Sequence, residues 1–224
     1  MQIKIKYYFL VIIIGALFWK CSETKELNPD DLGTNYYPLN VGDYRIYNVS
    51  GVEYISTADS VEFSYMLKES VVDSFMNLES GISYKIQREK KYTEDGLWEL
   101  DSIWTARKDN RTAVQVENNV PIIKLSFPMS ENLRWDGNRL NGNYIDEFIL
   151  LDFGQTYVDD FGFYSNTATV EQEYIPDTRV NWISMKEVYA EDIGLVYKEN
   201  VKIDFRIEPV FLNLRYYQHL VEWQ

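Results

Sequence analysis

Few residues in this chain are of the types that carry catalysis or hold a transition metal. His219 is the only histidine and Cys21 the only cysteine among the 224 residues. Catalytic triads and most zinc sites need histidine, usually with cysteine or carboxylate partners. A lone histidine in a terminal strand is more often a surface or packing residue. The sequence therefore predicts a protein that is not an enzyme and that needs no cofactor.

Neighbouring acids are the other candidates for catalysis. They occur as pairs at 146–147, 159–160 and 191–192. Glycoside hydrolysis uses two carboxylates about 5–10 Å apart across a cleft, whereas neighbours along a strand point to opposite faces of a sheet. Adjacency in sequence is therefore no argument for a hydrolase, and solvated loops are the favoured interpretation of these acids.

A loop at 136–147 has some of the oxygen ligands of a calcium loop. Asp136, Asn138 and Glu147 fit places 1, 3 and 12 of an EF-hand loop. Leu140 and Asn141 stand at places 5 and 6, where an oxygen ligand and a glycine belong, and no flanking helices are evident. These three residues are a weak calcium candidate, and no metal site is expected.

Tryptophan and tyrosine are abundant, because aromatic residues make up 16% of the chain. Such side chains form the walls of apolar pockets and of sugar-binding platforms, and they also fill the cores of sheets. If a ligand pocket exists, we expect its wall to contain Trp98, Trp104, Trp135 or Trp182. Core packing is the favoured alternative for all four residues.

Two serines stand in a pattern that resembles the Asp-Ser/Thr-apolar acceptor of O-glycosylation in Bacteroidota. They are Ser60, between Asp59 and Val61, and Ser102, between Asp101 and Ile103. If modified, these serines lie at the surface and carry bulky sugars. The alternative is that each is an unmodified turn or strand residue.

The beginning of the chain has the order of charge and hydropathy found in a secretory leader. Lys4 and Lys6 precede an uncharged, mostly apolar run at 7–19. A membrane-spanning helix has about 20 residues, and this run has fewer. The stretch around Cys21 resembles the lipobox of bacterial lipoproteins, in which cleavage precedes a cysteine that receives lipid. Alternatives are an uncleaved signal anchor and a signal peptide that is cut elsewhere.

Charge limits the possible partners. The formal net charge is −13, and the leader contributes only lysines, so the chain after residue 20 is more acidic still. Nucleic-acid binding needs a basic face and is not expected. Anionic lipid headgroups would not attract this chain either, so lipid on Cys21 is the expected link to the membrane. Two or more acyl chains give stable anchoring.

Short, alternating segments bounded by turn residues predict strands along the rest of the chain. They lie at 44–54, 61–72, 83–92, 97–108, 114–116, 121–127, 148–157, 166–174, 180–189, 194–199 and 211–223. The fold class is therefore all-β, with a β-rich α+β fold as the alternative. We expect a signal peptide at 1–20, a lipidated tether at 21–35 and one antiparallel β domain at 36–224.

Several motifs resemble those of an uncharacterised lipoprotein family from Bacteroidota. The family opening, YYPL-x-VG-x-W, is similar to YYPLNVGDY at 36–44. The middle motif is similar to LSFP at 125–128 with Trp135, and the ending YA-x-GVGLVYKE is similar to EVYAEDIGLVYKE at 187–199. A closing strand is similar to 217–223. The resemblance implies one strongly curved antiparallel sheet, such as the half-open barrel of lipoprotein carriers, and implies no catalytic residue.

Three functions remain open at this point. The first is a non-enzymatic binding or scaffold module of the cell envelope, anchored in the outer membrane, whose partner is an unknown envelope protein. The second is a carrier or sensor of a lipid or other apolar ligand in the concave face of the sheet. The third is a carbohydrate-binding or carbohydrate-active protein.

Overall fold

One antiparallel sheet makes up almost all of the protein. The computed structural model describes residues 32–78, 81–176, 181–206 and 213–224. Within these ranges twelve strands pair in the order β6-β5-β4-β3-β2-β1-β12-β11-β10-β9-β8-β7. Their bounds are β1 Tyr44–Tyr54, β2 Ser60–Met76, β3 Ile82–Lys91, β4 Glu99–Lys108, β5 Thr112–Glu117, β6 Val120–Ser126, β7 Arg134–Asp136, β8 Glu147–Val158, β9 Phe163–Ile175, β10 Asn181–Ala190, β11 Gly194–Asp204 and β12 Leu214–Trp223. The all-β prediction is confirmed.

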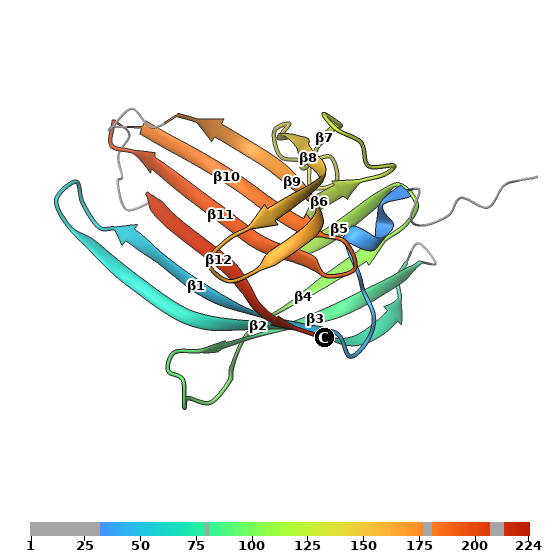
Figure 1. The fold of residues 1–224 in the computed structure, drawn as a ribbon, viewed down its shortest axis with the longest axis horizontal. Helices are drawn as coiled ribbons and strands as arrows, with labels where there is room; N and C mark the ends of the chain where they lie inside the picture. The colour runs from blue at the N-terminus through green and yellow to red at the C-terminus, as the bar shows by residue number, and fades with distance from the viewer. Residues whose placement is uncertain (1–31, 79–80, 177–180, 207–212) are drawn as a thin grey trace, which may run out of the picture.

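The sheet curls until its two edges meet, and this gives the half-open barrel that was expected (Figure 1). The edge strands are β6 and the short β7. The Ile123 amide in β6 donates to the carbonyl of Gly137, directly after β7, at 3.0 Å. The Trp135 indole in β7 donates to the carbonyl of Ile123 at 2.9 Å. The edges are therefore joined by isolated hydrogen bonds, and the sheet nearly closes.

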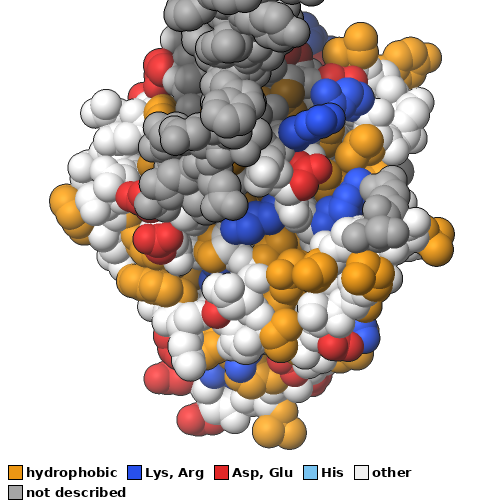
Figure 2. All heavy atoms as spheres, turned by 90° about the vertical axis from the view of Figure 1, so that its right-hand side faces the viewer, with side chains coloured by type: hydrophobic (Ala, Val, Ile, Leu, Met, Phe, Trp, Pro, Cys, Tyr) orange, Lys and Arg blue, Asp and Glu red, His pale blue; other side chains and the backbone are white. Residues whose placement is uncertain are grey.

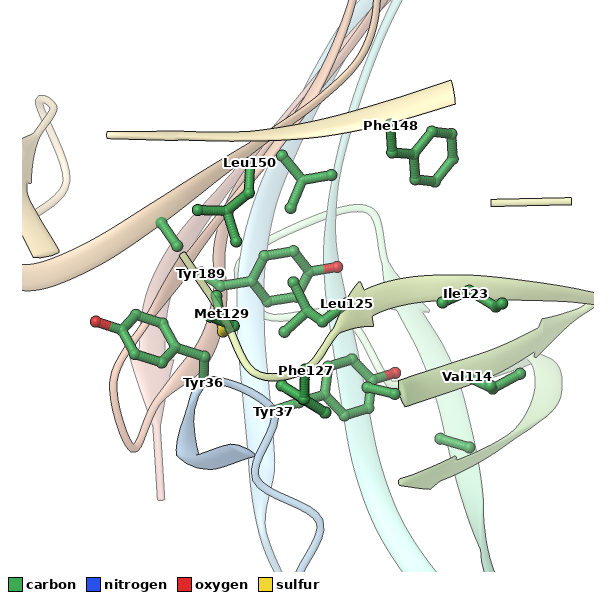
Figure 3. Close-up of a cluster of buried hydrophobic side chains, with 14 of the residues drawn as sticks. Tyr36, Tyr37, Val114, Ile123, Leu125, Phe127, Met129, Phe148, Leu150 and Tyr189 are labelled. Carbon is green, nitrogen blue, oxygen red and sulfur yellow. The ribbon is translucent and has the colours of Figure 1, made fainter. Parts of the chain in front are cut away.

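An apolar core fills one end of this barrel. Its side chains come from strands on both sides of the interior and from the segment that precedes β1 (Figure 3). Tyr37, Leu125, Leu150 and Tyr189 are among its buried members. Period-two alternation explains the core, because every second residue of each strand points inward.

The packed part of the chain begins before the expected boundary at residue 36. The Leu32 carbonyl accepts a hydrogen bond from the Met129 amide at 3.0 Å, and Leu32 itself is buried. The 3-10 helix η1 (Thr34–Tyr36) follows, and Lys108 Nζ donates to the Thr34 carbonyl at 2.8 Å. The last residues of the expected tether at 21–35 thus belong to the folded domain.

The expected leader at 1–20 and Cys21 lie outside the described residues. Among the described residues, no helix is long and apolar enough to cross a membrane. Figure 2 shows the face on the right-hand side of Figure 1. Acidic, basic and exposed hydrophobic side chains are intermixed there, so the net acidity of the chain does not produce a patch of one sign on this face.

Candidate functional site

A polar cavity of about 290 Å³ lies inside the curved sheet. Its walls come from β2–β5 on one side and from β10–β12 on the other, and β6 contributes one residue. Strands from both halves of the sheet can border one cavity only on the concave face. The cavity therefore lies beside the apolar core, in the same interior.

The first wall is a line of paired side chains on neighbouring strands. Glu187 in β10 lies opposite Lys198 in β11, and Lys198 lies opposite Gln218 in β12. Lys198 Nζ is 3.0 Å from Glu187 Oε1. The Tyr189 hydroxyl donates to Glu187 Oε2 at 2.6 Å, so both oxygens of this carboxylate are engaged.

Lys124 connects the edge strand β6 to this wall. Its Nζ lies 2.6 Å from Glu187 Oε1 and 3.2 Å from Glu117 Oε1 in β5. The side chains of Lys124 and Glu187 are only 4% and 1% exposed. Since isolated charges at such burial would be very costly, the two residues must be paired to be tolerated. The pair holds β6 against β10 across the interior.

The second wall carries another ionic cluster. Arg88 Nε in β3 donates to Glu69 Oε1 in β2 at 2.9 Å, and Lys90 Nζ lies 2.7 Å from Asp101 Oδ1 in β4. The Arg88 guanidinium also lies over the indole of Trp104, 3.7 Å from the ring centroid. Guanidinium groups stack on aromatic faces in this way. The stack fixes both side chains at the edge of the cavity.

The charges of these two clusters are matched. Burial would raise the pKa of Glu187, but Lys124 and Lys198 outweigh burial and hold that pKa well below its usual range. Burial would lower the pKa of Lys124, but Glu117 and Glu187 outweigh burial and raise that pKa above its usual value. Both groups therefore stay ionised across the physiological pH range. Four cations (Arg88, Lys90, Lys124, Lys198) face four acids (Glu69, Asp101, Glu117, Glu187).

Two residues that line the cavity each keep a buried donor without a protein partner. They are Trp104, through Nε1, and Gln218, through Nε2. The amide oxygen of Gln218 is already used, because it accepts the Tyr216 hydroxyl at 2.7 Å. An unmet buried donor costs about 1–3 kcal/mol. Both donors would gain from a hydrogen-bond acceptor inside the cavity.

A glycine makes room for the aromatic side chains beside the cavity. Gly51 in β1 pairs with Phe63 in β2 and with Tyr216 in β12. A Cβ at this position would lie 2.4 Å from Phe63 Cζ and 2.2 Å from the Arg215 carbonyl oxygen. Phe63 stacks on Tyr65 at 6.1 Å between ring centroids. Tyr65 and Tyr216 both line the cavity.

The four tryptophans that were candidates for a ligand wall lie in different places, and Trp104 alone among them lines this cavity. Trp135 is 8% exposed and packs edge-on against Phe148 in the core. Trp98 lies beside Lys91, and Trp182 lies beside Arg215. The four residues therefore do not form one wall.

The calcium candidates use their oxygens within the loop. Asp136 Oδ1 accepts the amides of Asn138 and Asp146, and Asn138 Oδ1 accepts Asn141 Nδ2. Glu147 forms an ion pair with Arg134. The described residues contain no group of three or more His, Cys, Asp or Glu side chains that could hold a metal ion. The geometry of the loop is thus that of a turn held by its own side chains.

The remaining candidates lie away from one another. Ser60 is exposed at the beginning of β2, whereas Ser102 is half-buried in β4 and donates to Asp101 Oδ2 at 2.9 Å. His219 Nδ1 lies 2.8 Å from Asp159 Oδ2, and its ring packs between Phe161 and Tyr197. His219 is therefore a packing residue with one acidic partner.

Sequence reasoning missed the charged residues of the cavity. Lys124 stands in the apolar run Ile122-Ile123-Lys124-Leu125, and Glu187 stands beside Val188. A charge at an inward position of an otherwise apolar strand is a signal of a buried partner. The partner itself could not have been found, because 63 positions separate the two residues.

No protein-family model and no curated protein matches this sequence. Two solved structures are similar to it. One is a "putative exported protein with YmcC-like fold" from Bacteroides fragilis, with 16% identity and a TM-score of 0.45, covering 84% of this chain and 98% of that chain. The other is a "putative lipoprotein" from Parabacteroides distasonis, with 12% identity and a TM-score of 0.44, covering 84% and 98%. Similarity at this level does not transfer a function.

Proposed function

We propose that this chain is an exported lipoprotein, anchored in the outer membrane of a bacterial envelope through lipid on Cys21, whose β domain binds a small polar ligand without catalysing a reaction. The leader supports the proposed localisation, because a basic beginning and a short apolar run precede the single cysteine. The cavity supports binding. Its volume of about 290 Å³ is close to the lower limit of small-molecule sites, which is about 300 Å³.

The observation that carries this proposal is the state of the polar groups around the cavity. The ionic side chains are already matched with each other, while Trp104 and Gln218 keep donors to spare. Most buried donors in a packed interior are satisfied within the protein. A binding site keeps them for a ligand.

The same groups argue against catalysis. A general acid or base works best when its pKa lies near the working pH. Lys124 and Glu187 are shifted in the opposite sense, because each is held in its charged form by its partner. Their geometry serves to fix the walls, and neither of these two groups is ready to exchange a proton near neutral pH.

An apolar ligand is the weaker alternative for this cavity. A hydrocarbon chain placed there would remove water from Arg88, Lys90 and Lys198 without replacing its hydrogen bonds. Many inward apolar side chains are instead packed against one another in the core beside the cavity. A role as a scaffold alone would not require a cavity.

Thermal denaturation of the membrane-purified protein in detergent tests the binding function. The compounds would be neutral sugars, amino acids, nucleosides and, as the apolar comparison, palmitate. We expect one polar class to raise the Tm in a concentration-dependent way, because a ligand that binds only the folded state stabilises it. Asn200→Trp places a bulky ring in the cavity and should abolish the shift, while Glu173→Trp on β9, away from the cavity, should keep it.

Two outcomes would refute the binding function. One is a shift with palmitate alone, and the other is no shift with any compound. The Tm of Asn200→Trp without ligand serves as the folding control for that variant.

Intact mass spectrometry of the same preparation tests the anchor. We expect a chain that begins at Cys21 and carries acyl chains. Cys21→Ser should release the protein from the membrane fraction, since the lipid is its only proposed link. A chain that begins at residue 1 and carries no lipid would contradict the proposed anchor and localisation.

A further inference from the structure

We propose that the ligand is a neutral, hydroxyl-rich molecule of the saccharide class, one or two sugar units in size. This inference rests on the proposed binding function and specifies its substrate class. The charge balance, the spare donors, the rings and the volume of the cavity support it.

The charge balance disfavours an ionic ligand. Lys124 is shared between Glu117 and Glu187, and Lys198 is paired with Glu187. On the opposite wall, Asp101 accepts both Arg88 and Lys90. An anionic ligand beside one of these cations would also lie beside the carboxylate that pairs with it, and a cationic ligand beside one of these acids would also lie beside its lysine or arginine. A neutral ligand leaves every pair in place.

The spare hydrogen-bonding groups favour a ligand with oxygen acceptors. Trp104 Nε1 and Gln218 Nε2 belong to opposite walls and have no protein partner. Both side chains border the cavity, so a ligand between the walls would lie beside them. A hydroxyl oxygen accepts a hydrogen bond and its proton can be donated in turn. The carboxylates of the lining, such as Glu69 and Glu117, have lone pairs that can accept such protons.

The rings add flat apolar surface among the polar groups. Tyr65 and Tyr216 line the cavity beside Trp104. One side of the Tyr65 ring is covered by Lys90 at 4.8 Å, as Arg88 covers Trp104. A sugar has polar edges and less polar C–H faces, so it suits a cavity where charged groups and ring faces alternate. The volume of about 290 Å³ favours one or two units over a long chain.

Isothermal titration calorimetry on the detergent-purified full chain tests this inference. The neutral probes are the methyl glycosides of glucose, galactose, mannose and N-acetylglucosamine, with maltose and lactose as disaccharides. Glucuronate and glucose 6-phosphate are their charged counterparts. We expect at least one neutral probe to bind, and each charged counterpart to bind more weakly than its neutral parent.

Two variants connect binding to the spare donors. Trp104→Phe removes the Nε1 donor and Gln218→Met removes the Nε2 donor. Each should weaken binding of the neutral probe by about two- to tenfold, which is the net value of one hydrogen bond. Trp98→Phe is the matched control, because Trp98 lies beside Lys91 and does not line the cavity. It should leave the affinity unchanged, and the Tm of each variant checks its folding.

The results separate this inference from the proposed function. Tighter binding of glucuronate or glucose 6-phosphate than of any neutral sugar would overturn the inference and leave a polar-ligand protein. So would the absence of sugar binding when amino acids or nucleosides raise the Tm. Sugar binding that neither Trp104→Phe nor Gln218→Met weakens would also overturn it, because the ligand would then lie elsewhere.

Discussion

Replacing Lys124 by methionine would break the buried ionic contact between β6 and β10. Methionine keeps the approximate length of lysine, so the change removes the charge and leaves most of the packing. Breaking a buried pair from one side costs about 3–5 kcal/mol, because the remaining charge is left without its partner. Here Glu187 keeps Lys198 at 3.0 Å and the Tyr189 hydroxyl at 2.6 Å. We therefore expect about 3 kcal/mol, the lower end of that range.

Urea denaturation of the mature chain carrying Cys21→Ser, followed by tryptophan fluorescence, measures this cost. With a slope of roughly 2–3 kcal/mol per molar urea for a domain of this size, the midpoint should fall by about 1–1.5 M. Arg134→Met is the control. It breaks the Arg134–Glu147 pair, whose side chains are 55% and 59% exposed, and such surface pairs contribute less than about 1 kcal/mol.

A second variant tests the reason for the loss. Lys124→Met combined with Glu187→Met removes both charges of the closest pair, so Glu187 is no longer a buried carboxylate without Lys124, and Lys198 is exposed enough to reach solvent. Glu117 loses Lys124 in the Lys124→Met single variant and in the double variant alike, so its loss does not enter the comparison. The double variant should be less destabilised than the sum of the two single ones, with a coupling of at least about 1 kcal/mol. If Lys124→Met costs no more than Arg134→Met, the pair does not hold β6 against β10 and the reasoning fails.

Three further predictions follow from single features of the structure. Because the folded-state pKa of Glu187 is depressed, its contribution to stability is present above the unfolded value of about 4.3 and is lost as the pH falls further. Glu187→Gln should therefore reduce the loss of unfolding free energy at acid pH, measured by urea titrations at pH 2–7. An unchanged loss at acid pH would contradict the depressed pKa of Glu187. Gly51→Ala should cost about 1–3 kcal/mol, because its Cβ would meet the Phe63 ring and the Arg215 carbonyl; Gly81→Ala, whose Cβ would meet only the Asn77 side chain, should cost less in the same assay. If the protein is O-glycosylated, peptide mapping should find the sugar on exposed Ser60 and not on Ser102, whose hydroxyl donates a hydrogen bond to Asp101. Sugar on Ser102 alone would contradict this preference for Ser60.

The strands were largely predictable because their signal is local. Alternation of residue types predicted a strand at 44–54, and β1 has these bounds. Turn residues predicted most of the other boundaries to within a few positions. The resemblance of the motifs to a family with a curved sheet implied the half-open barrel, which the structure confirms.

The interior was not predictable because it depends on pairing between distant strands. The segment at 83–92 was expected to be a polar strand with Tyr84 and Ile86 inward. The structure also turns Arg88 and Lys90 inward, where they meet Glu69 and Asp101. Conversely, Leu97 and Ile103 are 85% and 53% exposed, although their type predicts burial. Only the assembled sheet decides which face of such a strand meets charged partners.

The position of β12 has a consequence for how this protein is made. β12 lies between β1 and β11, so in the order of paired strands it connects β1–β6 to β7–β11. The Tyr44 and Gln224 backbones exchange hydrogen bonds at 3.1 Å in both directions, so the first strand is completed by the last residues of the chain. Contacts between such distant segments form slowly and late. The β1–β12 ladder therefore cannot form until residues 214–223 have been synthesised, and the sheet stays open between β1 and β11 until then.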